Sequence, residues 1–311
     1  AMTRVMVVLV ALVALACEPV VPAAEADSWS FEGFQVYSYV PPEPVGIVYV
    51  FHGSNGSAEI ANRIETTDQL NELVERGYGW VATESTLRTG NKRWEVNDPS
   101  LVTNPDLARL TRLHDELIDD TGVAADTPIF GIGMSNGARM VTLFGQAFAD
   151  NGYPVAAVAP FMGQLAGPVR SAGGLTVPAF WVIAENDGVV PNTAITADHQ
   201  QQVALGVPTR LHTKVEEPLL SARFTRIPAI DEIEAEAIRQ ALEDTGAWDA
   251  GGTRVLGIAE TLTLVSQLTL PPSFGATASQ VRNQIEALLA VHQFVGIFRT
   301  GVGNFFDAQL P

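Results

Sequence analysis

The chain has 311 residues, of which 47% are hydrophobic and 17% are charged, so it can bury a large core and does not have the composition of a disordered protein. It carries 18 basic and 35 acidic residues, a formal net charge of −17, and such a surface repels phosphate backbones. We therefore do not expect the protein to bind nucleic acid. The length of the chain and its hydrophobic content predict one large domain.

The N-terminal segment has the composition of a secretion signal. Arg4 provides a short positive region, residues 5–16 are an unbroken apolar run, and residues 24–26 (Ala-Glu-Ala) offer a small-x-small cleavage site. The apolar run is too short for a comfortable membrane span. We therefore expect residues 1–26 to be a signal peptide and the protein to be secreted or periplasmic.

The single cysteine, Cys17, lies at the end of this apolar run. The rest of the chain therefore has neither an internal disulfide nor a thiolate metal site. Residues 14–17 (Ala-Leu-Ala-Cys) also resemble a bacterial lipoprotein processing site, and a tether-like stretch follows at 18–28. A lipid anchor at Cys17 is the one membrane attachment that the sequence offers; the alternative is a chance cysteine in a discarded leader.

Strands and helices alternate along the following part of the chain, which favours a mostly parallel sheet with helices on both faces. In chain order, the predicted strands are 31–40, 46–51, 78–82, 128–134, 155–161, 177–184 and 210–215. The predicted helices are 57–76, 107–119, one that begins at Ser135, 193–205, 231–245, 279–289 and 294–310. The fold class is α/β.

The segment after the last predicted strand departs from this alternation. A helix over 231–245 begins with a capping-box-like pair, Asp231 and Glu234, and ends at Gly246. We interpret residues 218–275 as a small helical subdomain inserted into one domain that spans residues 27–311.

Residues 133–137 (Gly-Met-Ser-Asn-Gly) form a G-x-S-x-G motif centred on Ser135. A serine hydroxyl is a poor nucleophile unless it is exposed and next to a base, and a sharp turn from strand to helix provides that exposure. Here an apolar strand precedes the motif and a helix follows it. The alternative, a dinucleotide-binding loop, requires a G-x-G-x-x-G spacing that Gly131, Gly133 and Gly137 do not have. We predict that Ser135 is a nucleophile.

An acidic partner is predicted just after the strand 177–184. Asp187 leaves the C-terminal end of this strand within residues 185–191 (Glu-Asn-Asp-Gly-Val-Val-Pro). A carboxylate there can accept a hydrogen bond from an imidazole N–H, fix its tautomer and stabilise the imidazolium. Glu185 is the competing acid, and an ordinary turn aspartate is the alternative without catalytic role.

Three histidines follow Asp187 and compete for the role of base. His199 lies within a predicted helix and His212 within a predicted strand, where a surface or packing role is expected. His292 lies at a break between two predicted helices, and the insertion at 218–275 accounts for its long separation from Asp187. We predict that His292 is the base, with His212 as the main alternative.

With these features the chain resembles esterases of the polyhydroxybutyrate-depolymerase and feruloyl-esterase-like group of α/β hydrolases. The resemblance covers most of the chain from about residue 45 and rests on residues 52–57 (HGSNGS), 133–138 (GMSNGA), 187–191 (DGVVP) and 291–294 (VHQF), with 224–231 (FTRIPAID) also similar to relatives that carry a late insertion. The chain departs from the pattern after His292, where similar sequences often have an aromatic–Ser–acid run and this one has Phe294-Val-Gly-Ile.

The resemblance implies an α/β-hydrolase fold and a secreted serine carboxylic-ester hydrolase. It implies a triad of Ser135, Asp187 and His292, an acyl-enzyme, and a substrate that is a small acyl or aryl ester or a polyester, without a cofactor. An acyltransferase with the same triad, a serine peptidase and a non-catalytic binding protein are the alternatives. We expect a monomer.

The resemblance also implies an oxyanion hole made of two backbone N–H groups. The residue after the nucleophile, Asn136, supplies one, and Ser54 in the His52-Gly53-Ser54 turn supplies the other, with Gly53 as the alternative. His52 precedes Ser135 and so breaks the serine–acid–histidine order. We therefore assign His52 to loop geometry.

The loop after the strand 78–82 supplies one further candidate. Trp94 lies there beside Lys92 and Arg93, and an aromatic residue in a loop at the active-site edge is a candidate for a substrate subsite. Gly53 is a second candidate for contact with substrate. The chain has neither an H-E-x-x-H motif nor a phosphate-binding G-K-[ST] loop, so we expect no metal site.

Overall fold

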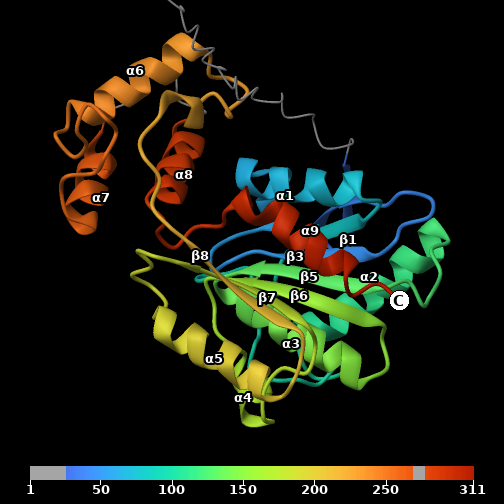
Figure 1. Cartoon of the computed structure of the whole chain (residues 1–311). Coiled ribbons are helices and arrows are strands. Elements are labelled where there is room, and N and C mark those ends of the chain that lie inside the picture. The colour runs from blue at the N-terminus through green and yellow to red at the C-terminus, as the bar shows by residue number, and fades with distance from the viewer. Residues whose placement is uncertain (1–25, 269–276) are drawn as a thin grey trace, which may run out of the picture.

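The computed structural model describes residues 26–268 and 277–311. These residues form an eight-stranded sheet with the strand order β1-β2-β4-β3-β5-β6-β7-β8 (Figure 1). The strands are β1 (Asp27–Phe31), β2 (Phe34–Tyr39), β3 (Ile47–Phe51), β4 (Gly79–Thr83), β5 (Ile129–Met134), β6 (Val155–Phe161), β7 (Ala179–Ala184) and β8 (Thr209–Lys214). β2 pairs antiparallel with β1 and β4, and the other neighbouring strands are parallel. Cys17 and all but the last residue of the predicted leader 1–26 lie outside the described residues.

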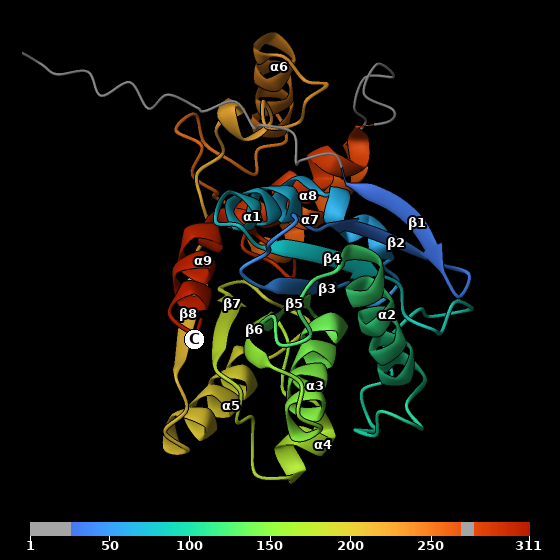
Figure 2. The same ribbon diagram turned by 90° about the vertical axis from the view of Figure 1, so that its right-hand side faces the viewer.

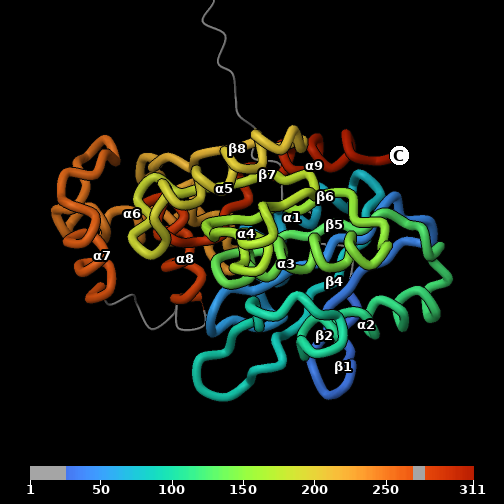
Figure 3. Tube along the Cα trace, turned by 90° about the horizontal axis from the view of Figure 1, so that it is seen from below, coloured from blue at the N-terminus to red at the C-terminus, as the bar shows by residue number. Residues whose placement is uncertain are grey.

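Helices cover both faces of the sheet (Figure 2). One face carries α1 (Ile64–Glu75) and α9 (Arg299–Asp307). The other face carries α2 (Pro105–Thr121), α3 (Asn136–Asp150), α4 (Gly167–Ser171) and α5 (Asn192–Ala204), and Figure 3 looks onto α3, α4 and α5 on this face. The order of the strands and these two helical layers are those of an α/β-hydrolase fold, which confirms the predicted fold class.

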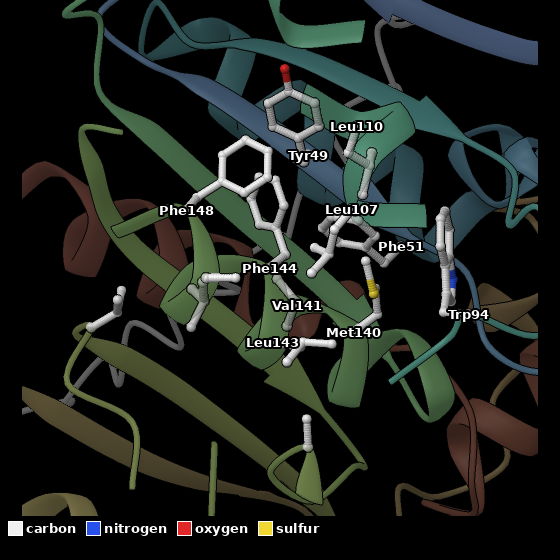
Figure 4. Packing of buried hydrophobic residues seen from close by; sticks show 14 of the residues in the cluster. Tyr49, Phe51, Trp94, Leu107, Leu110, Met140, Val141, Leu143, Phe144 and Phe148 are labelled. Carbon is white, nitrogen blue, oxygen red and sulfur yellow. The ribbon is translucent and has the colours of Figure 1, made fainter. Parts of the chain in front are cut away.

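Alternation along the strands builds a separate apolar core on each face. Tyr49, Phe51 and Trp181 belong to the core beneath α2, α3 and α5. There Phe144 of α3 packs against Tyr49, Phe51 and Phe148 (Figure 4). Val48 and Phe180, one residue out of phase, belong to the core beneath α1 and α9. β3 is buried along its whole length, at the centre of the sheet.

Three predicted elements differ from the structure where the backbone turns. The predicted edge strand 31–40 is internal, because Glu32 and Gly33, with φ angles of 51° and 79°, turn the chain and the unpredicted β1 takes the edge beside β2. The predicted helix 57–76 is a 3₁₀ turn, η1 (Ala58–Asn62), followed by α1, because Arg63 is extended. The predicted helix 294–310 is likewise a 3₁₀ turn, η4 (Gly296–Phe298), followed by α9.

The late insertion has a hydrophobic core of its own. It contains η2 (Ser221–Arg223), α6 (Glu232–Glu243) and α7 (Ile258–Gln267), which lie beside the sheet in Figure 1. The capping box forms as predicted, since Asp231 and Glu234 each accept a hydrogen bond from the other's backbone N–H (2.8 and 3.2 Å). The core also includes Val281, Ile285 and Leu288 of α8 (Ala278–Leu288). α8 therefore packs against the residues of the predicted insertion, while its Ala287 belongs to the core beneath α1 and α9.

Among the described residues, no helix combines the length and the apolar character that crossing a membrane requires.

Candidate active site

Ser135 lies on a sharp turn between β5 and α3. Its φ and ψ angles are 59° and −117°, a conformation that costs a non-glycine residue on the order of 1–3 kcal/mol and is typical of functional sites. The backbone N–H of Ser135 donates to the carbonyl of Phe161 at the end of β6 (2.9 Å), which fixes the turn to the neighbouring strand. The serine is partly exposed, as a nucleophile must be.

The two glycines of the motif allow this turn to pack closely. A Cβ atom on Gly133 would lie 2.1 Å from the carbonyl oxygen of Gly137, and one on Gly137 would lie 2.2 Å from that of Phe51. Both distances are far below contact, so only glycine permits α3 to begin this close to β3 and β5. The spacing of the motif thus follows from packing around Ser135.

Asp187 and His292 form a hydrogen-bonded pair. His292 Nδ1 lies 2.8 Å from Asp187 Oδ2, and the Asp187 side chain is completely buried. An ionised carboxylate only accepts hydrogen bonds, so Nδ1 carries the proton and, in the neutral ring, Nε2 is the unprotonated nitrogen. This is the tautomer that a general base requires.

The Asp187 turn holds this carboxylate ionised. Burial raises the pKa of Asp187, but the hydrogen bonds from His292 and from the backbone N–H groups of Val190 and Val189 outweigh it and hold the pKa below its ordinary value. Those two N–H groups donate to Oδ1 at 3.0 and 2.8 Å, which leaves Oδ2 for the imidazole. The carboxylate is therefore both charged and oriented.

The segment that carries His292 is anchored on both sides. Asn186 holds the turn before it: its backbone N–H donates to the carbonyl of Ala290 (2.9 Å) and its side chain to that of Leu289 (2.8 Å). After it, the backbone N–H of Gly296 donates to the buried Glu65 (2.7 Å). Since Asn186 is next to Asp187, the acid and the histidine belong to one hydrogen-bonded unit.

A chain of contacts links His292 to Ser135. Phe294, two residues beyond the histidine, packs its ring 4.5 Å from that of Phe161, whose carbonyl accepts the Ser135 N–H. His292 Nε2 is buried and has no hydrogen-bond partner among the described residues. His292 makes no hydrogen bond to Ser135 among the described residues, and it is not one of those that line the Ser135 pocket. Catalytic hydrogen bonds of this kind often form only when substrate is bound.

The residues that compete with Asp187 and His292 for the acid and base roles lie elsewhere or have other contacts. The Glu185 carboxylate accepts the backbone N–H of Glu216 (3.1 Å). His212 on β8 stacks on Phe180, with ring centroids 4.5 Å apart and planes 15° apart, on the face of the sheet covered by α9. His199 lies on α5. Among the described histidines, His292 is the one that contacts an acid in the expected loop.

Ser54 and Asn136 are the two residues predicted to supply the oxyanion N–H groups. Both residues line one pocket with Ser135. Asn136 is the first residue of α3, so its N–H has no acceptor within the helix. The N–H of Ser54 makes no hydrogen bond to another described residue. The N–H of Gly53, the alternative donor, likewise makes no hydrogen bond to another described residue. A Cβ atom placed on Gly53 would lie 3.4 Å from the Cβ of Ser135.

Trp94 does not take the position expected of a substrate subsite. Its side chain is 1% exposed and packs against Phe51, with ring centroids 5.3 Å apart, at the edge of the core shown in Figure 4. The indole N–H donates to the carbonyl of His52 (2.9 Å), and the Trp94 backbone N–H donates to the side chain of Asn136 (2.7 Å). Its polar group is satisfied inside the fold, so Trp94 supports the turn at His52, and it is not among the described residues that line the pocket of Ser135.

His52 is a buried structural residue, in agreement with its assignment to loop geometry. Nε2 accepts the backbone N–H of Ser85 (3.1 Å), so Nδ1 is the nitrogen that donates to the Gly53 carbonyl (2.7 Å). Burial lowers the pKa of His52 to about 4, so the ring is neutral at pH 7.

Neutral His52 makes the fold sensitive to acid. The unfolded chain takes up a proton near pH 6.5 and the folded chain does so only near 4, so stability falls as the pH drops through this window. We expect the titration of His52 alone to lower the unfolding free energy by about 2 kcal/mol when the pH falls from 7 to 5. His52→Gln keeps a donor and an acceptor but does not titrate, and chemical denaturation at both pH values should show a correspondingly smaller fall. His199→Gln, which changes a partly buried histidine, is the control and should keep most of the fall in unfolding free energy between pH 7 and pH 5. If His52→Gln shows the same fall as the wild type, the buried neutral His52 is not its cause.

The pocket that contains Ser135 has a volume of about 330 Å³. Its walls come from the turn that contains Ser54, the loop before α2, the start of α3, the loop after β6 and the turn after Asp187. The lining residues are Ser54, Asn91, Arg93, Ser135, Asn136, Arg139, Gly163, Gln164, Val189, Val190 and Pro191. Sequence reasoning missed Arg139, although its position four residues after the nucleophile places it one helical turn away. It also chose Trp94 where its neighbour Arg93 is the residue that faces the pocket.

The described residues contain no group of three or more histidine, cysteine or acidic side chains placed to hold a metal ion. The chemistry that this site offers is that of its serine, imidazole, carboxylate and backbone N–H groups.

No protein-family model matches the chain, and no curated protein matches it. The chain is similar to several solved structures of esterases. These include an acetyl xylan esterase from Aspergillus awamori (14% identity, 58% of this chain and 79% of that one, TM-score 0.45), a carboxylesterase from Mesorhizobium loti (15%, 71% and 99%, 0.43) and esterase PE8 (15%, 67% and 96%, 0.46). The α/β-hydrolase fold of the chain rests on its own strand order and not on these distant similarities.

Proposed function

We propose that the chain is a serine carboxylic-ester hydrolase. The observation that carries the proposal is the pairing of His292 Nδ1 with the buried Asp187 in a chain whose Ser135 is held in a strained turn at the C-terminal end of β5. Ser135 attacks the ester carbonyl while His292 Nε2 takes its proton, and Asp187 stabilises the imidazolium that forms. His292 then protonates the leaving alcohol, and a water activated by the same ring releases the acid.

The backbone N–H groups of Ser54 and Asn136 hold the oxyanion in this proposal. They are free of other described partners and lie at the wall of the Ser135 pocket, so they are available for a charge that develops on the carbonyl oxygen. The N-terminus of α3 adds a positive partial charge at the same place.

The substrate class in this proposal is a small acyl or aryl ester, or an ester group of a polyester. A pocket of about 330 Å³ is at the lower end of the range for small-molecule sites, so it takes one ester group with short substituents. Secretion by way of residues 1–26, with or without a lipid anchor at Cys17, is part of the proposal and rests on the sequence alone.

The test is covalent labelling together with turnover. We expect a fluorophosphonate probe to label the full chain at Ser135, as mapped by peptide mass spectrometry, and the protein to hydrolyse members of a panel of 4-nitrophenyl esters, feruloyl esters and polyesters. The matching 4-nitroanilides, which are amides, should react much more slowly. Labelling with transfer to an added alcohol in place of hydrolysis would favour an acyltransferase. A chain that is neither labelled nor active on the panel is not a hydrolase.

A further inference from the structure

Two arginines line the pocket of Ser135. Arg139 lies on α3 one turn beyond the nucleophile, and its backbone N–H donates to the Ser135 carbonyl (3.2 Å). Arg93 lines the pocket from the loop between β4 and α2. The other polar side chains at the described walls, such as Gln164 and Asn91, are neutral, and no carboxylate is among them. The pocket is thus basic in a chain whose net charge is −17.

Neither arginine is paired with a carboxylate of the described residues. Arg170, the next cation in this region, shows the contrast, since its guanidinium makes hydrogen bonds of 2.9 and 2.7 Å to Asp198. Burial and the positive charges of Arg170 and Arg93 lower the pKa of Arg139, and the nearby Glu95 offsets only part of this. An anion bound between Arg93 and Arg139 would relieve the repulsion between them.

The backbone around Arg93 is fixed even though its side chain is exposed. The carbonyl of Lys92 accepts the N–H of Asn55 in the turn that contains Ser54 (2.7 Å). On the other side, Trp94 is bonded through its backbone N–H to Asn136 and through its indole to His52. Arg93 therefore projects from a segment whose backbone is held in place, so on this loop binding an anion requires ordering of the Arg93 side chain and not of the backbone.

We propose that the preferred substrate is a small ester that carries a free carboxylate, and that Arg93 and Arg139 bind this carboxylate while Ser135 attacks the ester. The inference rests on the proposed ester hydrolysis. Guanidinium groups present planar pairs of donors that match a carboxylate, and these charge-assisted hydrogen bonds are about twice as strong as neutral ones. The carboxylate belongs to the acyl part or to the alcohol part of the ester, and the experiment separates the two.

The experiment compares matched pairs of esters that differ in one charge. For the acyl part, the pair is mono-4-nitrophenyl glutarate and its methyl ester; for the alcohol part, it is 4-acetoxybenzoate and its methyl ester. We expect kcat/KM to favour the charged member in at least one pair. The preference should shrink as salt is added, since Arg93 is exposed and its charge is screened.

Variants then assign the preference to the two arginines. Arg139→Gln should lower the ratio of charged to neutral kcat/KM about tenfold, because it removes a charge-assisted hydrogen bond in a half-buried position. Arg93→Gln, which is more exposed, should lower it about threefold. Arg210→Gln removes an exposed arginine of β8 that does not line the pocket, and the ratio should stay as in the wild type.

The outcomes separate this inference from the proposed function. If the wild type hydrolyses the neutral esters as well as the charged ones, and the ratio does not change in Arg139→Gln, the carboxylate site is wrong while ester hydrolysis stands. An equal loss in Arg210→Gln would mean that net charge, and not the pocket, sets the preference, which also overturns the site. If none of the four esters reacts and Ser135 takes up no fluorophosphonate, both proposals fail.

Discussion

Ser135→Ala is expected to lower kcat for ester hydrolysis about 10⁶-fold, the loss found when a triad nucleophile is removed. The change removes the one atom that would form the acyl-enzyme. It leaves the neighbouring contacts in place, because the turn is held by the backbone bond from Ser135 to Phe161 and by the close packing of Gly133 and Gly137. The measurement is kcat on a 4-nitrophenyl ester, with a thermal melt to show that the variant is folded.

Ser54→Ala is the matched control for this prediction. It removes a second hydroxyl from the same pocket but keeps the backbone N–H to which we assign the oxyanion role. We expect its kcat to remain within about tenfold of the wild type, since losing the N–H itself would cost about 100- to 1000-fold. A Ser135→Ala protein that retains activity within tenfold of the wild type would defeat the serine mechanism.

The parts of the site that were predicted from sequence are those with a local pattern. A strand, a glycine-flanked serine and a helix in succession require the sharp turn that Ser135 occupies. The placement of Asp187 just past the end of a buried strand follows from the fact that parallel strands end at one edge of the sheet. The contact of Asp187 with His292 follows because the chain must return to that edge after the insertion. Their catalytic roles stay predictions.

The parts that were missed depend on where side chains point from irregular backbone. The sequence places both Trp94 and Arg93 in a loop at the edge of the sheet, and it gives no reason to choose between them. The choice is made by one hydrogen bond from the indole to the His52 carbonyl, which turns Trp94 inward and leaves Arg93 at the pocket.

The support of the His292 segment was also beyond sequence reasoning. Glu65 on α1 receives the Gly296 N–H and is paired with Arg223 and Arg226 of the insertion (3.0 and 2.6 Å). These partners are far apart in the chain, and a buried acid in an amphipathic helix carries no signal of such a contact. The same network ties the insertion to the segment that presents the histidine.

His292→Ala is expected to lower kcat about as much as the loss of the serine, about 10⁶-fold, because the serine and the base act as one unit. KM should change little, since His292 is not among the described residues that line the pocket. The hydrogen bond to Asp187 disappears, and the buried carboxylate keeps only the N–H groups of Val189 and Val190. Some loss of thermal stability is therefore expected alongside the loss of turnover, and kcat must be measured well below the melting temperature.

His212→Ala decides whether this effect belongs to His292. Both changes remove an imidazole that follows Asp187 in the chain, but His212 stacks on Phe180 away from the serine. Its loss should leave kcat within a few-fold and lower the unfolding free energy by about 1 kcal/mol, the value of a lost aromatic pair. The opposite pattern, with turnover abolished by His212→Ala and kept in His292→Ala, would move the base to β8. The Asp187 carboxylate is buried and bonded to His292, so it is not available to His212. Such a result would therefore require a different acid as the partner of His212, and the assignment of Asp187 to the triad would be wrong as well.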